Sequence, residues 1–353
     1  MIKIKEALKK IFFFLKRKIS IYGIIAIVVI IVIIIGAFIF WQNFPKKYTG
    51  PVEKINLGVA NNFMCSLMFV AENKGYFKEN GLEVNIKKIS SGKVALDTML
   101  KDASLDIVTV AQTPVVFSSF INSNFSIIAG TSYSYNDVFV LARRDRGITS
   151  PADLRGRNIG VTEGTIGHYF LNIFLNNNNL LLSDVKVINL PADQLTQSMT
   201  AGTVDAISTW QPYISNAQKA LGNNSIIFPN NNIYREDIYS VSNKEFIKNH
   251  PEAIVRFLKA IQQTENFILQ NKDQAAAIMA NELNMDKDFV FSIFGNYQFG
   301  LFLDQATIQT IENQARWAIQ NKLTDKTTVP NYLDYIYINA LEEVKPGAMT
   351  IVH

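Results

Sequence analysis

The chain has 353 residues, of which 48% are hydrophobic, 18% charged and 11% aromatic. This balance excludes a disordered chain, a collagen-like chain and a small disulfide-rich scaffold. One cysteine excludes an internal disulfide and a cysteine-based metal cluster, and the three histidines lie far apart in the sequence. We therefore expect a globular protein without a metal or other cofactor.

Positive charge is concentrated at the N-terminus. Residues 1–20 contain seven Lys and Arg and one Glu, a net charge of +6, whereas the whole chain carries +4. The other residues therefore carry a net charge of −2, so they create no overall positive potential that would attract nucleic acid. We expect no nucleic-acid partner.

A long charge-free segment follows the basic end. No charged residue occurs from Ile19 to Pro45, and residues 21–41 are rich in Ile and Val. About 20 helical residues span a bilayer core, and basic residues stay on the cytoplasmic side. We predict a basic cytoplasmic segment at 1–20 and a single transmembrane anchor at 21–41, with the remaining chain extracytoplasmic at the cell membrane. A cleaved signal peptide is the alternative, but the segment is long and ends in bulky residues without an A-x-A-like site.

Apolar runs alternate with helical patterns in the rest of the chain, which indicates an α/β fold. The expected strands are Ile55–Ala60, Leu82–Ile86, Ile107–Val110, Ile127–Gly130, Val138–Ala142, Asn158–Val161, Val185–Leu190 and Ala206–Thr209. After about Asn243 the pattern is almost entirely helical, and Pro251 with Glu252 is typical of a first helical turn.

The strand pattern repeats within the chain. Asn56–Val59 resembles Asn158–Val161, and Leu105–Pro114 resembles Val204–Pro212. Each pair of matches encloses a helix, a strand and a helix. The repeat predicts two similar halves and hence two lobes with a crevice between them.

Polar loops follow the predicted strands. Ligands of open α/β sheets bind beyond the carboxyl ends of strands, beside helix N-termini. The candidate ligand-binding residues in these loops are Asn62, Phe63, Ser91, Gly92, Gln112 and Thr113 in the first half and Glu163, Gly164, Thr165, Trp210 and Gln211 in the second. The alternative for each is structural: a buried aromatic for Phe63 and Trp210, and helix capping for the loops at Ser91 and Thr165.

A set of short segments occurs in an order that is typical of one family. The segments are Glu72–Phe77, Glu79–Val84, Ser91–Gly92, Ile148–Arg157, Gly164–Thr165 and Ala201–Pro212. Together they resemble the sulfonate/nitrate/taurine-type substrate-binding proteins of ABC importers, which include binders of thiamine-pyrimidine precursors. The resemblance implies a two-lobed periplasmic-binding (type II) fold that captures a small polar molecule without turnover and delivers it to an ABC permease and ATPase.

The resemblance also implies two crossovers between the lobes, which we place near Asp137 and Tyr234. Lobe one would then comprise residues 52–136 plus 235–353, and lobe two residues 137–234. An enzyme on the same fold and a ligand sensor that acts through a partner are the alternative functions. The cysteine-rich and histidine motifs of the pyrimidine-forming relatives do not occur in this sequence.

Two acids bear on the charge of the ligand. Glu163 is expected in a loop that faces the crevice, and Asp137 lies near the first crossover and joins the candidate site. A carboxylate beside the ligand opposes a bound sulfonate or nitrate by like-charge repulsion. We therefore favour a planar polar heterocycle, such as a pyrimidine-like compound stacked on Trp210, over taurine or nitrate.

Overall fold

The computed structural model describes residues 21–42 and 48–352. The predicted basic segment at 1–20 lies outside the described residues. Helix α2 (Ile21–Gln42) belongs to one unit of the chain, and Thr49–His353 forms a second, compact unit. Within the part of the chain that the structure describes, no helix is long and apolar enough to cross a membrane. The anchor stays a prediction from the sequence.

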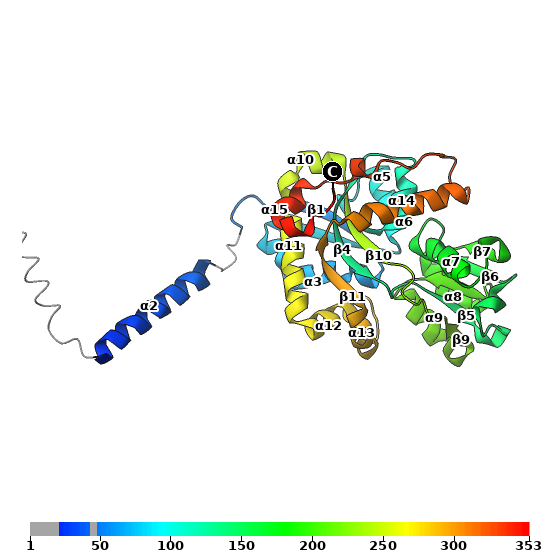
Figure 1. The fold of residues 1–353 in the computed structure, drawn as a ribbon, viewed down its shortest axis with the longest axis horizontal. Coiled ribbons are helices and arrows are strands. Elements are labelled where there is room, and N and C mark those ends of the chain that lie inside the picture. Colours follow the sequence, from blue (N-terminus) through cyan, green and yellow to red (C-terminus); the bar gives the residue numbers. More distant parts are fainter. Residues whose placement is uncertain (1–20, 43–47, 353) are drawn as a thin grey trace, which may run out of the picture. The chain divides into compact units, whose positions relative to one another are not determined.

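The compact unit folds into two lobes, each built around its own sheet (Figure 1). The lobe-one sheet has the order β11 (Tyr297–Phe302), β4 (Phe125–Ser134), β10 (Glu236–Asn243), β3 (Ile107–Ala111), β1 (Glu53–Ala60) and β2 (Leu82–Ile89). The lobe-two sheet has the order β7 (Lys186–Asn189), β6 (Asn158–Val161), β8 (Ala206–Thr209), β5 (Phe139–Arg143) and β9 (Ser225–Ile227). The predicted α/β class is confirmed.

Helices surround both sheets. Lobe one carries α3 (Leu67–Asn73), α4 (Tyr76–Glu79), α5 (Gly92–Asp102), α6 (Gln112–Ser119), α10 (Lys244–Asn249), α11 (Pro251–Gln270), α12 (Lys272–Glu282), α13 (Lys287–Ile293), α14 (Gln305–Gln320) and α15 (Asn339–Val344). Lobe two carries α7 (Ile166–Asn177), α8 (Leu195–Ala201) and α9 (Tyr213–Leu221). The 3-10 helices are η1 (Phe63–Ser66), η2 (Arg144–Arg146), η3 (Pro151–Leu154), η4 (Leu182–Asp184), η5 (Ala192–Gln194), η6 (Gly222–Asn224), η7 (Phe294–Asn296), η8 (Tyr332–Tyr335) and η9 (Pro346–Ala348).

The lobe-one core lies on both faces of the central strands. Helices α5 and α6 pack on β3, whereas α11 packs on β2, β4 and β11. Strand β3 is buried at every position, as a strand covered on both faces must be, and its sequence is accordingly apolar. The strands β1, β2 and β3 run parallel, and β10 runs antiparallel to β3.

Three strands were not among the predicted ones: β9, β10 and β11. Strand β11 interrupts the region after Asn243 that the sequence pattern assigned to helices, so that prediction is wrong there. Strand β10 contains two acids, two serines and an asparagine, yet only its last residue is more than slightly exposed. A polar sequence of this kind does not indicate a buried strand, because its burial depends on partners from other parts of the chain.

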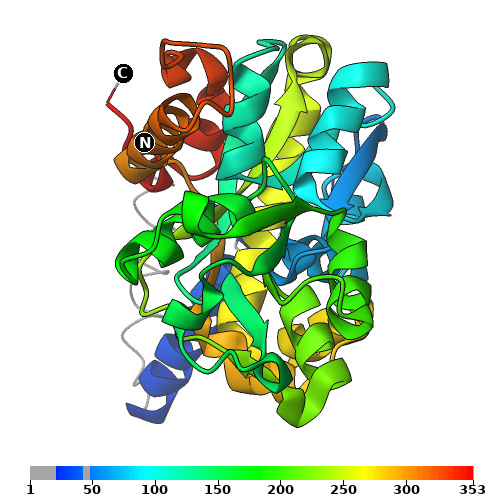
Figure 2. The ribbon, with the colours of Figure 1, turned by 90° about the vertical axis from the view of Figure 1, so that its right-hand side faces the viewer.

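The chain passes between the lobes twice. It leaves the lobe-one sheet after β4 and enters lobe two at β5, and it returns between β9 and β10. Asp137 lies in the first connection and Tyr234 in the second. In Figure 2 lobe two, in green, faces the viewer.

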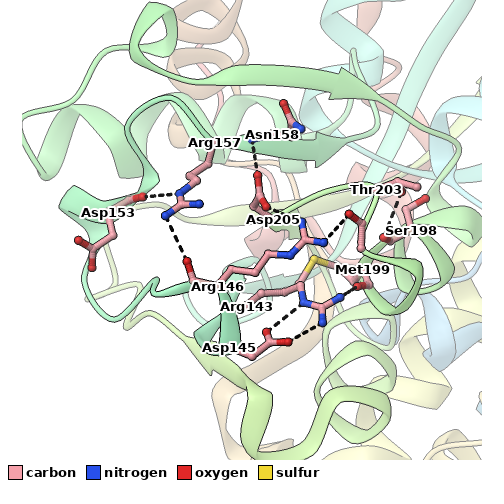
Figure 3. Close-up of polar contacts among 11 residues, drawn as sticks. Arg143, Asp145, Arg146, Asp153, Arg157, Asn158, Ser198, Met199, Thr203 and Asp205 are labelled. Carbon is pink, nitrogen blue, oxygen red and sulfur yellow. Dashed lines mark hydrogen bonds and ion pairs between the residues drawn. The ribbon is translucent and has the colours of Figure 1, made fainter.

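The sequence repeat appears as the same hydrogen-bonding arrangement in both lobes. In lobe one the Asp106 carboxylate accepts the backbone N–H of Asn56 at 2.7 Å, and the Asn56 carbonyl accepts the N–H of Asp106 at 2.9 Å. In lobe two Asp205 and Asn158 make the same two bonds at 2.9 and 2.8 Å. Asp205 additionally pairs with Arg146 at 2.6 Å (Figure 3). These aspartates therefore tie neighbouring strands together and have a structural role.

Asp205→Ala is expected to lower the free energy of unfolding by about 2–3 kcal/mol, because it leaves the half-buried N–H of Asn158 without its acceptor and removes the ion pair with Arg146. The control is Asp106→Ala in lobe one, which removes the same backbone hydrogen bond and a bond from the Asn56 side chain at 3.2 Å, but no ion pair. Urea denaturation of both variants measures the difference. Equal losses of unfolding free energy for the two aspartates would show that the Arg146 pair contributes no more than the Asn56 side-chain bond.

Candidate functional site

A small cavity lies between the lobes. Its lining residues from lobe two are Thr165, Ile166 and Trp210. Those from lobe one are Ala60, Asn62, Cys65, Ser91, Gly92, Lys93, Val110, Ala111 and Pro114, together with Glu236 and Ile238 of β10. In this structure the cavity leaves about 20 Å³ for the centres of water-sized groups, which is room for about one water molecule. Because both lobes line the cavity, a bound ligand contacts both of them. Ligand binding therefore depends on how the two lobes are placed relative to each other.

Two helices begin at the cavity. Helix α5 starts at Gly92, and the Ser91 side chain caps it by accepting the N–H of Val94 at 3.3 Å. Helix α7 starts at Ile166 with Thr165 as its cap residue, and the Thr165 hydroxyl donates to the Thr162 carbonyl instead of capping. The N-terminal end of a helix carries partial positive charge and orphan N–H groups. The two helix starts therefore suit an anionic or hydrogen-bond-accepting group of a ligand.

Glycine permits both helices to approach the sheets closely. A Cβ on Gly92 would lie 2.8 Å from the Val110 Cα in β3. A Cβ on Gly167, in the first turn of α7, would lie 2.5 Å from the Ser208 carbonyl oxygen in β8. Both distances are shorter than real Cβ contacts, so any larger residue would push a helix start away from its sheet.

A pair of buried carboxyls lies beside the cavity. Asp137 and Glu236 are each 1% exposed, and the Asn62 amide nitrogen lies 3.3 Å from an oxygen of each. Tyr297 donates to the other oxygen of Asp137 at 2.8 Å. Burial raises the pKa of Asp137 to about 7 and raises the pKa of Glu236 well above its usual value, with the Asp137 charge adding to the latter. The pair therefore holds a proton at neutral pH.

Hydrogen bonds between the lobes hold the cavity closed. The Trp210 indole N–H donates to the Asn61 carbonyl at 3.1 Å, and the Tyr213 hydroxyl donates to the Ser90 carbonyl at 2.7 Å. The Phe63 N–H donates to the Gln211 carbonyl at 3.1 Å. All three bonds join lobe one to residues 210–213, which form the loop after β8 and the first residue of α9, so this segment closes the cavity.

Five of the candidate residues from the sequence line the cavity: Asn62, Ser91, Gly92, Thr165 and Trp210. Others lie near it without lining it. Asp137 lies behind Asn62 and Glu236, and the Gln211 amide oxygen accepts the N–H of Ser215. A Cβ on Gly164 would lie 3.3 Å from the Lys93 side chain, so Gly164 contacts lobe one.

Three candidates serve packing in lobe one. The Phe63 ring lies 4.6 Å from Tyr297 within an aromatic cluster. The Gln112 side chain donates to the Arg235 carbonyl, and the Thr113 hydroxyl donates to the Gln314 side chain. Their side chains therefore point into the lobe rather than toward the cavity, and they do not line it.

Glu163 is also outside the cavity lining. It is exposed, and its backbone N–H donates to Asn189 at 3.1 Å. The turn at Gly164 has a positive φ of 71°, which directs the chain into α7 and leaves Glu163 on the outer side of the loop. The predicted preference for a heterocycle over taurine or nitrate depended on Glu163 facing the cavity. Because Glu163 does not face it, the structure gives that preference no support. The carboxyl that does line the cavity is Glu236.

Glu236, Lys93 and Cys65 line the cavity but are not among the candidate residues from the sequence. Lys93 lines the cavity while its ammonium pairs with Asp97 at 2.5 Å. The signal that could have revealed Glu236 is its position two residues after Tyr234, the residue nearest the second predicted crossover. No group of three or more His, Cys, Asp or Glu side chains among the described residues is arranged to hold a metal ion.

Comparisons with known proteins agree with this arrangement. The model of the family described as NMT1/THI5 like matches residues 62–275. A Bacillus subtilis protein named for binding aliphatic sulfonates is 24% identical over 336 residues, which are 92% of this chain and 98% of that protein.

Two solved structures share the fold. The alkanesulfonate-binding protein SsuA from Xanthomonas axonopodis pv. citri, bound to MOPS, matches 82% of this chain and 100% of its own chain with a TM-score of 0.70 at 14% identity. The desulfurization enzyme DSZB matches 83% and 98% with a TM-score of 0.58 at 15% identity. The periplasmic-binding fold and the family resemblance predicted from the sequence are thereby confirmed, and the chain belongs to the NMT1/THI5-like family.

Proposed function

We propose that this chain is the solute-binding component of an ABC importer. It captures a small polar solute between its two lobes and passes it to a permease that an ATPase drives. The observation that carries the proposal is the cavity whose lining comes from both lobes. The hydrogen bonds that join the lobes supply the closed state in which a solute is held.

The ligand chemistry follows from the two helix starts. An acceptor-rich or anionic group fits where α5 and α7 begin, because both present the positive ends of their dipoles there. A sulfonate is such a group, and the similar protein from Bacillus subtilis is named for sulfonates. We therefore expect alkanesulfonates of small size among the bound solutes.

We also propose that the N-terminal segment tethers the protein to the outer face of the cytoplasmic membrane. The charge-free sequence from Ile19 to Pro45 and the net +6 of residues 1–20 support this location. N-terminal sequencing of the protein from the membrane fraction tests it. A mature chain that begins near Lys46 would contradict an uncleaved anchor.

Binding without turnover is favoured over an enzymatic role by the state of the one thiol in the cavity. Burial raises the pKa of the Cys65 thiol far above its usual value, and the nearby Glu236 and Asp137 act in the same direction. A cysteine nucleophile must ionise to a thiolate. Cys65 therefore stays protonated, and Cys65→Ser is expected to leave the stoichiometry of solute binding unchanged.

Native mass spectrometry of the freshly purified chain tests solute capture. We expect one small molecule bound to each chain, and small-angle scattering should show a more compact envelope with the solute than after its removal. A chain that carries no solute, and whose envelope does not respond to alkanesulfonates or pyrimidines, would contradict the proposal.

Trp210→Phe is expected to weaken solute binding about tenfold, because it removes the indole hydrogen bond to Asn61 that helps to close the lobes. Trp317→Phe is the matched control: Trp317 also packs between the lobes, against His168 and Tyr169, but its indole N–H has no hydrogen-bond partner among the described residues. Calorimetric titration of both variants with the copurified solute gives the comparison. If both variants lose the same affinity for the solute, the weaker binding comes from the smaller ring and not from the lost hydrogen bond.

A further inference from the structure

We propose that Glu236, supported by Asp137 and Asn62, binds a nitrogen of the solute that is positively charged or carries N–H groups. The solute would then have two ends: an acceptor group at the starts of α5 and α7, and this nitrogen at Glu236. The inference rests on the proposed function and deepens it, because it names the chemical class that the site selects.

The first support is the incomplete hydrogen bonding of Glu236. Its side chain lines the cavity and is buried, and its Oε1 accepts from Asn62 at 3.3 Å. No N–H or O–H of the described residues donates to its Oε2. A buried carboxyl oxygen normally accepts hydrogen bonds, and its desolvation is unfavourable without them. A donor on the solute would supply the missing bond.

The second support is the charge around the carboxyl pair. None of the described ion pairs involves Asp137 or Glu236. The neighbouring Arg235 is bound to Asp237 and Asp304, and the Lys93 ammonium in the lining is bound to Asp97. The protein therefore supplies no cation to the pair, and a cationic nitrogen on the solute would relieve the repulsion between the two carboxyls.

A proton links the pair in the free protein. Burial raises the pKa of both carboxyls, so one proton stays on the Asp137–Glu236 pair at neutral pH. The other titratable groups around them are Tyr297 on β11, Cys65 on η1, and Tyr234, Arg235 and Asp237 beside Glu236. A cationic nitrogen at Glu236 takes the place of that proton, so binding of such a solute releases a proton to solvent.

Matched pairs of probes test the inference. We compare 2-aminoethanesulfonate with ethanesulfonate, which differ only in the amino group, and 4-aminopyrimidine with pyrimidine, which differ in a neutral N–H donor. The wild-type chain is expected to prefer the amino-bearing member of at least one pair by about tenfold or more. The sulfonate pair reports a cationic nitrogen and the pyrimidine pair a neutral one.

Glu236→Gln is expected to reduce this preference to near unity, whereas Glu163→Gln, at an exposed acid outside the cavity, should retain it. A second measurement does not depend on any variant: titration of the wild-type chain in buffers of different ionisation enthalpy should show proton release with 2-aminoethanesulfonate and none with ethanesulfonate.

Equal binding within both pairs, an undiminished preference in Glu236→Gln, or a copurified solute without an N–H group would overturn the inference and leave solute capture intact. A chain that binds no solute at all would overturn both proposals.

Discussion

Arg235→Ala is expected to lower the free energy of unfolding by about 3–5 kcal/mol, because it leaves the buried carboxylate of Asp237 without its ion-pair partner. The Arg235 guanidinium pairs with Asp237 at 2.6 Å and with Asp304 at 3.1 Å, and it lies over the Tyr133 ring at 4.3 Å. The Asp237 side chain is 1% exposed, so water does not replace the lost partner. The segment before β10 would lose the contact that fixes its position.

The loss should depend on pH. Burial raises the pKa of Asp237 to about 7, and the Arg235 charge acts against that rise. Without the arginine the pKa rises further, so the folded variant keeps a proton that the unfolded chain releases above pH ~4. The folded state then binds more protons than the unfolded state, and stability falls as pH rises through this window. The cost of Arg235→Ala is therefore larger at pH 8 than at pH 5.

Urea denaturation at both pH values measures this effect. Arg316→Ala is the control, because Arg316 is half exposed and pairs with Glu312 on the same helix. Pairs of that kind contribute about 0.3–0.5 kcal/mol. In a chain that already carries Asp237→Asn, Arg235→Ala should lower the free energy of unfolding much less. Equal losses for the two arginines, or a loss without pH dependence, would contradict the expected role of Arg235.

Gly167→Ala is the second change with a large expected effect. In an exposed helix interior alanine is more stable than glycine by about 1 kcal/mol. Here the new Cβ would lie 2.5 Å from the Ser208 carbonyl oxygen and 3.2 Å from its carbon. Backbone atoms of β8 cannot rotate away as a flexible side chain would. We expect the variant to be less stable by about 1–3 kcal/mol and α7 to move off the sheet.

The same shift should weaken solute binding at least tenfold, because it displaces the α7 start from the cavity. Gly295→Ala is the control: no atom lies within 4 Å of its added Cβ. Denaturation and solute titration of both variants provide the comparison. A Gly167→Ala chain as stable as Gly295→Ala would show that α7 does not require the close approach.

The sequence predicted the features that local patterns determine. Apolar runs revealed the strands of the parallel parts of both sheets, and the similarity of Asn56–Val59 to Asn158–Val161 revealed the two halves. The structure explains the repeat, since Asp106 and Asp205 make the same bonds to Asn56 in β1 and Asn158 in β6. The loops at Ser91 and Thr165 were found because strand ends and helix starts coincide there.

Features that depend on partners distant in the sequence were missed. Strand β10 reads as polar, and it is buried because Arg235 pairs with Asp237 and Asn62 donates to one oxygen of Glu236, both from outside the strand. Glu236 faces the cavity for that reason, and no local pattern indicates it. Conversely, Glu163 has the expected position along the chain, but the backbone turn at Gly164 leaves its side chain exposed. The direction of one side chain in a loop depends on backbone angles that the residue types alone do not determine.

Hydrogen–deuterium exchange tests the central claim that the solute binds between the lobes. The chain is compared with and without its copurified solute. We expect slower exchange at 60–66 and 90–95 in lobe one together with 164–168 and 209–214 in lobe two, because the lining of the cavity comes from both. Protection confined to one lobe, or to the outer groove of lobe one that Val52 and Gly81 help to line, would contradict a site between the lobes.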